Sequence, residues 1–177
     1  PPEGLLYENT MPKIVEDMEA LRKHIGVEKW ILSGGSSGST VALLYAIAHP
    51  DRVLAMNVHG ITFLTRAELM WTGWVSSDIW ADEWHRLKNV RDEKGKRILS
   101  KEDVSSFDAF VAAGYREVVK KKNRKFAFSV LNMGMRQTQI DPHGPEINIG
   151  GDRAFRMAQI IWHMWYHKFF LPENYVR

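Results

Sequence analysis

The sequence predicts an α/β fold, in which parallel strands with flanking helices are followed by a mostly helical region. Apolar runs and helix-like runs alternate between residues 10 and 58, and a glycine-rich turn joins the first apolar run to the next helix. Strands and helices that alternate at this spacing are typical of parallel pairing. From residue 62 onward the patterns are helical and rich in tryptophan, which predicts the second part.

The first helix is expected over residues 10–25. Thr10 is a favourable N-cap, Pro12 suits a first turn, and apolar residues recur at helical spacing until Gly26. The next three elements are expected to be a strand, an almost wholly apolar helix and a second strand, over residues 27–33, 40–48 and 53–58.

The remaining elements are expected to be helices. Their patterns cover residues 65–87, 104–122, 126–135 and 154–170, with loops that contain glycine, proline and charged residues between them. We therefore divide the chain into an α/β core segment over residues 1–61 and a helical region over residues 62–177.

Composition excludes several kinds of site. The chain has no cysteine, so disulfides, thiolate metal sites and a cysteine nucleophile are absent. A formal net charge of +3 is too small to indicate a nucleic-acid-binding surface, and no apolar run is long enough to span a bilayer. The first ten residues lack the features of a signal peptide, and we expect an intracellular protein, either cytoplasmic or organellar.

The string Gly34-Gly35-Ser36-Ser37-Gly38 falls where the first strand meets the apolar helix. A sharp strand-to-helix turn exposes a serine side chain to a catalytic base, and it requires small residues two before and two after that serine. Gly34 and Gly38 occupy those structural positions around Ser36, the predicted nucleophile. The backbone N–H of Ser37 would help to hold an oxyanion. The alternative is a Gly/Ser-rich linker or an anion-binding loop; the first interpretation predicts strained backbone angles at Ser36.

Residues 16–60, "EDMEALRKHIGVEKWILSGGSSGSTVALLYAIAHPDRVLAMNVHG", resemble the nucleophile region of the prolyl iminopeptidases, which are α/β-hydrolases. Those enzymes typically show G-G-S-W-G-S-T, then an alanine-rich helix that ends in H-P, and a strand that leads to a G-I dipeptide. The likeness continues into residues 60–87, which are similar to the start of the family's helical cap. The resemblance implies a partial α/β-hydrolase fold in which residues 62–177 form a cap-like region.

Two positions depart from the family's pattern. Ser37 stands where the family usually has tryptophan, and Ile161 stands where a cap-helix glutamate helps to hold the substrate's amino group. In the family, the triad aspartate and histidine follow the cap, and the oxyanion loop precedes the nucleophile strand. We expect these parts to come from outside this sequence, which also lacks an initial methionine.

Residues within the chain offer few substitutes for the missing groups. His59 lies after the second strand, where the family does not place its base, and Asp141-Pro142-His143 is more typical of a turn than of an acid–base pair. His163 and His167 have a zinc-compatible spacing but lack the H-E-x-x-H pattern, so we predict no metal site and no cofactor. The basic run at residues 120–125 is interpreted as a solvated helix end rather than a polyanion contact.

Two functions are therefore left open. The chain is either part of a serine hydrolase that releases N-terminal residues from peptides through an acyl-enzyme on Ser36, or a catalytically inactive hydrolase-like subunit with a structural or binding role in a larger assembly. In both cases the two-stranded sheet needs further strands, from the remaining hydrolase segments or from other protein chains. Purified alone, the chain is expected to aggregate or to behave as a molten species.

Overall fold

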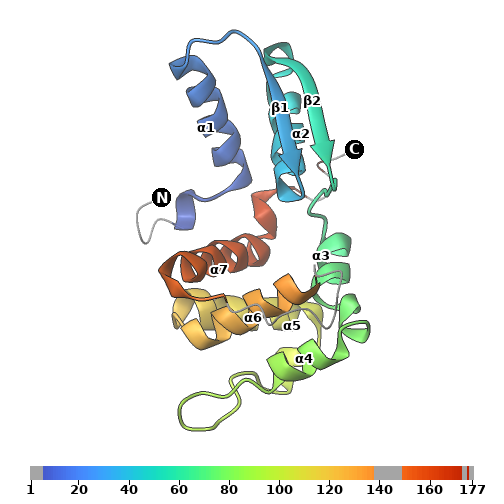
Figure 1. Cartoon of the computed structure of the whole chain (residues 1–177), viewed down its shortest axis with the longest axis vertical. Coiled ribbons are helices and arrows are strands. Elements are labelled where there is room, and N and C mark those ends of the chain that lie inside the picture. The colour runs from blue at the N-terminus through green and yellow to red at the C-terminus, as the bar shows by residue number, and fades with distance from the viewer. Residues whose placement is uncertain (1–5, 138–148, 173–174, 176–177) are drawn as a thin grey trace. The chain divides into compact units, whose positions relative to one another are not determined.

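The computed structural model describes residues 6–137, 149–172 and 175. It divides into two compact units (Figure 1): unit 1 is Pro1–Leu69 with His167–Arg177, and unit 2 is Met70–Tyr166. The domain boundary predicted at residue 61 stays a prediction. In the ranges that the structure describes, every helix is too short or too polar to cross a membrane.

Unit 1 contains a parallel pair of strands, which confirms the predicted α/β class. Strands β1 (Trp30–Gly35) and β2 (Val53–His59) pair from Trp30 opposite Val53 to Gly35 opposite His59. Helix α2 (Ser37–Ala48) connects them, because parallel neighbours need a crossover. This helix begins three residues before the predicted start, since Ser37-Gly38-Ser39 carries no apolar pattern.

Helix α1 (Met11–His24) packs against α2 and joins the core of unit 1. It begins as predicted, because the Thr10 hydroxyl accepts a hydrogen bond from the Lys13 amide at 3.2 Å. Across the two helices, the Tyr45 hydroxyl donates to Glu19 at 2.8 Å, and Arg22 donates two further hydrogen bonds to the same carboxylate. The hydrogen bonds from Arg22 and Tyr45 hold the pKa of Glu19 well below its usual value.

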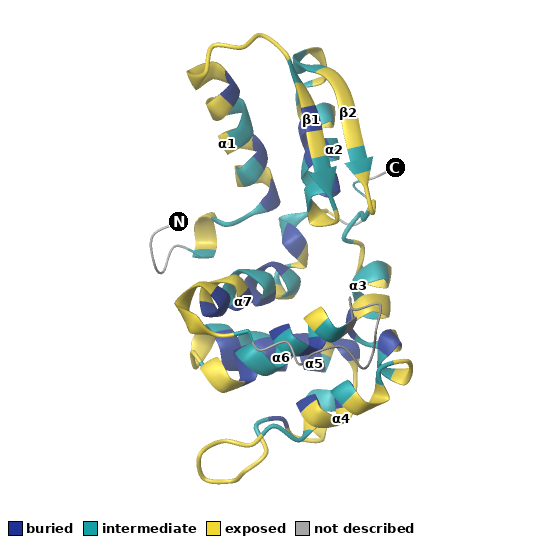
Figure 2. Ribbon diagram, in the orientation of Figure 1, coloured by how far each residue is buried: buried dark blue, intermediate teal, exposed yellow. Residues whose placement is uncertain are grey.

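The sheet of unit 1 keeps apolar surface exposed (Figure 2). Leu32 is 4% exposed and packs into the core with Val15, Ala42 and Tyr45, whereas Ile31 and Leu54 are each 65% exposed. Within the described ranges, each strand also pairs along one edge alone. Among the described residues of unit 1, α1 and α2 therefore bury apolar residues of the sheet such as Leu32, whereas Ile31 and Leu54 lack the cover that both faces of a parallel sheet normally have.

Most helices after residue 61 are shorter than the patterns that predict them, whereas the helix predicted at residues 126–135 is longer and covers Arg124–Gln137. The pattern at residues 104–122 divides because Ser106 caps a new helix by accepting a hydrogen bond from the Ala109 amide at 3.2 Å. The pattern at residues 154–170 ends early because Lys168, Phe169 and Phe170 have positive φ. The elements in chain order are α3 (Arg66–Gly73), η3 (Val75–Asp78), α4 (Ala81–Lys88), η4 (Glu102–Val104), α5 (Phe107–Gly114), a π-helix (Tyr115–Lys120), α6 (Arg124–Gln137), α7 (Gly151–Tyr166) and η6 (Lys168–Phe170).

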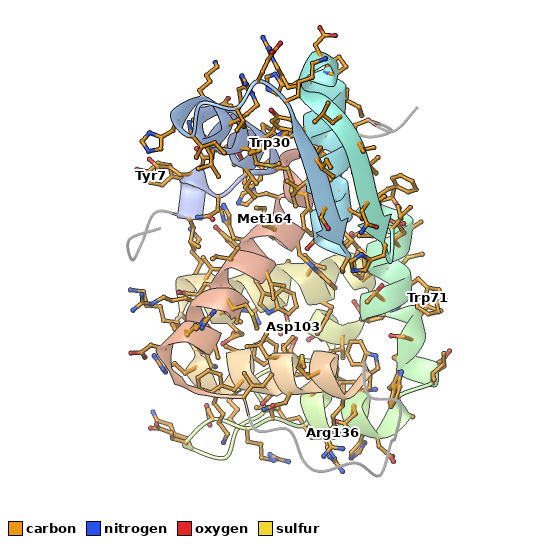
Figure 3. The ribbon with its side chains drawn as sticks, turned by 45° about the horizontal axis from the view of Figure 1, so that its top comes forward. Tyr7, Trp30, Trp71, Asp103, Arg136 and Met164 are labelled. Carbon is orange, nitrogen blue, oxygen red and sulfur yellow. The ribbon has the colours of Figure 1, made fainter. Side chains whose placement is uncertain are left out.

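Aromatic side chains form the core of unit 2. The ring of Phe110 lies 4.9 Å from that of Trp84 and 5.5 Å from that of Trp162, measured between centroids, and all three residues are buried. Offset and edge-to-face pairs of this kind add to the stabilisation that burial provides. Trp84 and Trp162 are thus core residues, whereas Trp71, labelled in Figure 3, is exposed.

A buried carboxylate belongs to a network of ion pairs in unit 2. Glu117 is 3% exposed, and its carboxylate accepts hydrogen bonds from Lys121 at 2.8 Å and Arg116 at 3.0 Å. Arg116 donates two more, at 2.9 Å each, to Asp103 (labelled in Figure 3). Burial acts to raise the pKa of Glu117, but the hydrogen bonds from Lys121, Arg116 and Asn123 outweigh burial and lower it. Arg116 likewise lowers the pKa of Asp103.

We expect unit 2 to lose stability below about pH 4. Because both carboxyl groups have lowered pKa values in the folded state, their stabilisation is present above their usual pKa values and disappears as the pH falls through the lowered ones. Glu117→Gln should weaken this acid dependence and should cost about 1–3 kcal/mol at neutral pH. Urea unfolding followed by tryptophan fluorescence measures both effects. Glu93→Gln, at an exposed loop position, is the control, and an equal response of the two variants would contradict the prediction.

Candidate active site

Ser36 occupies a strained turn between the parallel strand β1 and helix α2. It follows Gly35, the last residue of β1, and precedes Ser37, the first of α2. Its φ of 52° and ψ of −129° lie in a region that a residue with a side chain rarely adopts. The strained backbone predicted for Ser36 is thereby confirmed. The linker alternative does not describe this segment.

Close contact between the strand and the helix explains one of the two glycines in the predicted elbow. A Cβ atom added to Gly34 would lie 2.3 Å from the carbonyl oxygen of Gly38, and that oxygen belongs to the backbone. A Cβ atom added to Gly38 would meet no atom within 4 Å, apart from its own helix backbone and chain neighbours. The need for glycine therefore falls on position 34.

Gly35 has a spatial reason of its own, which the sequence analysis missed. A Cβ atom there would lie 2.3 Å from Nε2 of His59, the residue that pairs with Gly35 across the sheet. Because side chains alternate along a strand, the imidazole of His59 lies on the sheet face opposite to α2. The doubled glycine at residues 34 and 35 is the sequence signal for this arrangement.

The side chain of Ser36 is available for chemistry. Ser36 is the N-cap residue of α2, yet its hydroxyl makes no capping hydrogen bond, and the residue is exposed. Ser37 is exposed at the start of the same helix, where backbone N–H groups and the helix dipole favour negative charge. The geometry is compatible with the predicted roles of Ser36, Ser37 and Gly34, and it gives no steric reason for glycine at position 38; all four roles remain predictions.

Comparison with known proteins identifies the family. The alpha/beta hydrolase fold family matches residues 1–137. The chain belongs to this family. A probable proline iminopeptidase from Leptolyngbya boryana is 36% identical over 104 residues, which are 56% of this chain and 32% of that protein.

Further relatives of this chain are also named proline iminopeptidases. A proline iminopeptidase from Arabidopsis thaliana is 35% identical over 102 residues, which are 55% of this chain and 27% of that protein. A putative proline iminopeptidase from Mycoplasma pneumoniae is 56% identical over 48 residues, which are 27% of this chain and 16% of that protein. The chain thus resembles proline iminopeptidases, and it matches at most about a third of the length of these three relatives.

Among the residues that the structure describes, no triad partner is bonded to Ser36. Within the described ranges, neither a histidine nor a carboxylate side chain is hydrogen-bonded to Ser36. The segment Asp141-Pro142-His143 lies outside the described residues. His163 is buried in α7, but that helix ends before His167, so the two histidines do not share one helix face. The described residues contain no group of three or more side chains that could hold a metal ion.

Proposed function

We propose that this chain is the nucleophile-bearing part of a serine hydrolase of the proline iminopeptidase type. Such an enzyme would release N-terminal residues from peptides through an acyl-enzyme on Ser36. The observation that carries the proposal is the exposed Ser36 on a strained turn from a parallel strand into a helix, in an alpha/beta hydrolase that resembles proline iminopeptidases.

In the proposed reaction, Oγ of Ser36 attacks the carbonyl carbon of the peptide bond that follows the substrate's N-terminal residue. The carbon–nitrogen bond breaks, and the amine of the shortened peptide leaves with the proton taken from the serine hydroxyl. Water then hydrolyses the ester on Ser36. The Ser37 N–H and the positive end of the α2 dipole would stabilise the oxyanion of each tetrahedral intermediate. This chemistry requires no cofactor.

We propose that the triad histidine and acid come from hydrolase segments outside these 177 residues. Two observations support this: among the described residues, neither a histidine nor a carboxylate side chain is hydrogen-bonded to Ser36, and the matched stretch is at most about a third of the length of the reported relatives. The same segments, or another protein chain, would supply the strands that the edges of β1 and β2 lack.

A second candidate is a catalytically inactive, hydrolase-like subunit with a structural or binding role. Ile161 favours it, because this half-buried residue of α7 is apolar where the resemblance implies a glutamate for the substrate's amino group. The first turn of α7 contains Asp152, which forms an ion pair with Arg124 at 2.7 Å. Without a glutamate at position 161, an enzyme built on this chain would recognise an N-terminal amine through other groups or would prefer other substrates.

Labelling with a fluorophosphonate probe tests the proposal. We expect a longer protein that contains this segment and the remaining hydrolase elements to be labelled at Ser36, because the histidine supplied by those elements would activate the serine. The 177-residue chain alone is expected to remain unlabelled. Peptide mapping by mass spectrometry identifies the modified residue.

Two variants control this measurement. Ser36→Ala should abolish labelling of the longer protein, whereas Ser33→Ala, the same change at an exposed position of β1, should not affect it. Absence of labelling at Ser36 in the folded longer protein would support the inactive subunit. Labelling of the 177-residue chain that disappears in Ser36→Ala would show that the base lies within this chain.

A further inference from the structure

Hydrogen bonds hold the backbone of Ser36 from both sides. Its N–H donates to the carbonyl oxygen of His59 at 3.2 Å, and its own carbonyl oxygen accepts from the amide of Ser39 at 2.9 Å. The hydroxyl of Ser39 donates to the same carbonyl oxygen at 2.6 Å. Because the positive φ of Ser36 is costly, this turn persists only where the surrounding bonds enforce it.

The hydroxyl of Ser39 also reaches a second segment of unit 1. It accepts a hydrogen bond at 3.1 Å from the amide of Thr62, which lies 23 residues further along the chain. The next residue, Thr40, donates its hydroxyl to the carbonyl oxygen of Thr62 at 2.6 Å. Ser39 and Thr40 are 0% and 1% exposed, so two buried hydroxyls of the first turn of α2 bind both backbone groups of Thr62.

Glu68 fixes the segment around Thr62 from its other end. One oxygen of its carboxylate accepts from the amides of Phe63 and Thr65, each at 3.0 Å, and from the Thr62 hydroxyl at 3.3 Å. Burial acts to raise the pKa of Glu68, but these amide and hydroxyl hydrogen bonds lower it, so the carboxylate is charged at neutral pH. The Tyr175 hydroxyl donates to the carbonyl oxygen of Phe63 in the same segment.

A serine that bonds to a carbonyl three residues earlier is common at helix starts and would not by itself indicate a role. Here the Ser39 hydroxyl also accepts a hydrogen bond from the distant amide of Thr62. If that hydroxyl is removed, the Thr62 amide loses this partner. One side chain therefore connects the strained residue to a segment whose own position is set by Glu68.

From these contacts we propose that Ser39 is a positioning residue for Ser36, and that Glu68 supports it by holding the segment to which Ser39 is bonded. The proposal rests on the proposed function for its effect on catalysis. Without the Ser39 hydroxyl, the turn loses one of the bonds that enforce its strained backbone, and Oγ of Ser36 no longer has a fixed direction of attack.

The test compares Ser39→Ala and Glu68→Gln with Ser76→Ala in a longer protein that contains this segment and the remaining hydrolase elements. Ser76 is a matched control, because it is a buried serine of unit 2 whose hydroxyl donates to the carbonyl oxygen of Thr72 at 2.6 Å. We expect Ser39→Ala to lower kcat and the rate of fluorophosphonate labelling about tenfold, the equivalent of one hydrogen bond, with KM unchanged. Glu68→Gln should lower kcat and the labelling rate by a smaller factor. Ser76→Ala should change neither kcat nor the labelling rate.

A purely structural role would give a different pattern. Labelling that is unchanged per folded molecule in both Ser39→Ala and Glu68→Gln would overturn the proposal. Hydrogen exchange of the amides at residues 36–39 and 62 gives a readout that does not depend on activity. If the wild-type protein is not labelled, the proposed function fails. Faster exchange at these amides in Ser39→Ala would then still support the positioning of the turn, and unchanged exchange would overturn it.

Discussion

Gly34→Ala is expected to destroy the turn that presents Ser36. The added Cβ atom would lie 2.3 Å from the oxygen and 2.6 Å from the carbon of the Gly38 carbonyl group, and neither backbone atom can rotate away as a side chain can. Overpacking of this kind costs about 1–3 kcal/mol, and we expect the upper end of that range. A longer protein that contains this segment and the remaining hydrolase elements should show a lower melting temperature and no detectable fluorophosphonate labelling at Ser36.

Gly38→Ala is the matched comparison for this prediction. It makes the same chemical change at the other glycine of the motif, where the new Cβ atom would enter open space. We expect this variant to keep the wild-type melting temperature, because position 38 lies within α2 and has a negative φ. An equal loss of stability in Gly34→Ala and Gly38→Ala would show that the close approach of strand and helix does not decide which glycine is required.

The motif around Ser36 could be predicted from the sequence because its determinants are local. Strand, turn and helix follow one another within twenty residues, and each carries its own pattern of apolar residues and glycines. The sequence motif does not distinguish Gly34 from Gly38, because a sequence gives no distances between atoms. The difference between them depends on how β1 approaches α2, and it becomes visible only in three dimensions.

Contacts between distant residues were beyond the sequence analysis. The bond from the Tyr45 hydroxyl to Glu19 joins residues that are 26 positions apart, and the bond from the Thr62 amide to the Ser39 hydroxyl joins residues that are 23 apart. Polar residues of this kind have no period that distinguishes them from solvated ones. The division of the helix predicted at residues 104–122 has a similar cause, because the capping hydrogen bond of Ser106 competes with an apolar pattern that continues past it.

The 177-residue chain, purified alone, is expected to self-associate through unit 1. Two strands do not form an independently stable sheet in water, and β1 and β2 leave Ile31 and Leu54 exposed beside strand edges that no described residue pairs with. Unit 2 differs, because its helices enclose an aromatic core that includes Phe110 and Trp162. Amides of β1 and β2 should therefore exchange with solvent much faster than amides of α5 and α7.

Light scattering and hydrogen exchange measure these two properties. Leu54→Lys should reduce self-association, because a charge beside an open strand edge opposes pairing with another chain. Ile79→Lys, the same change at an exposed position of unit 2, should have little effect. A monodisperse monomer that unfolds in one sharp transition, with β1 and β2 protected as strongly as α7, would contradict the prediction. It would mean that the contacts within unit 1, such as those of Glu19 with Arg22 and Tyr45, stabilise a two-stranded sheet without further strands.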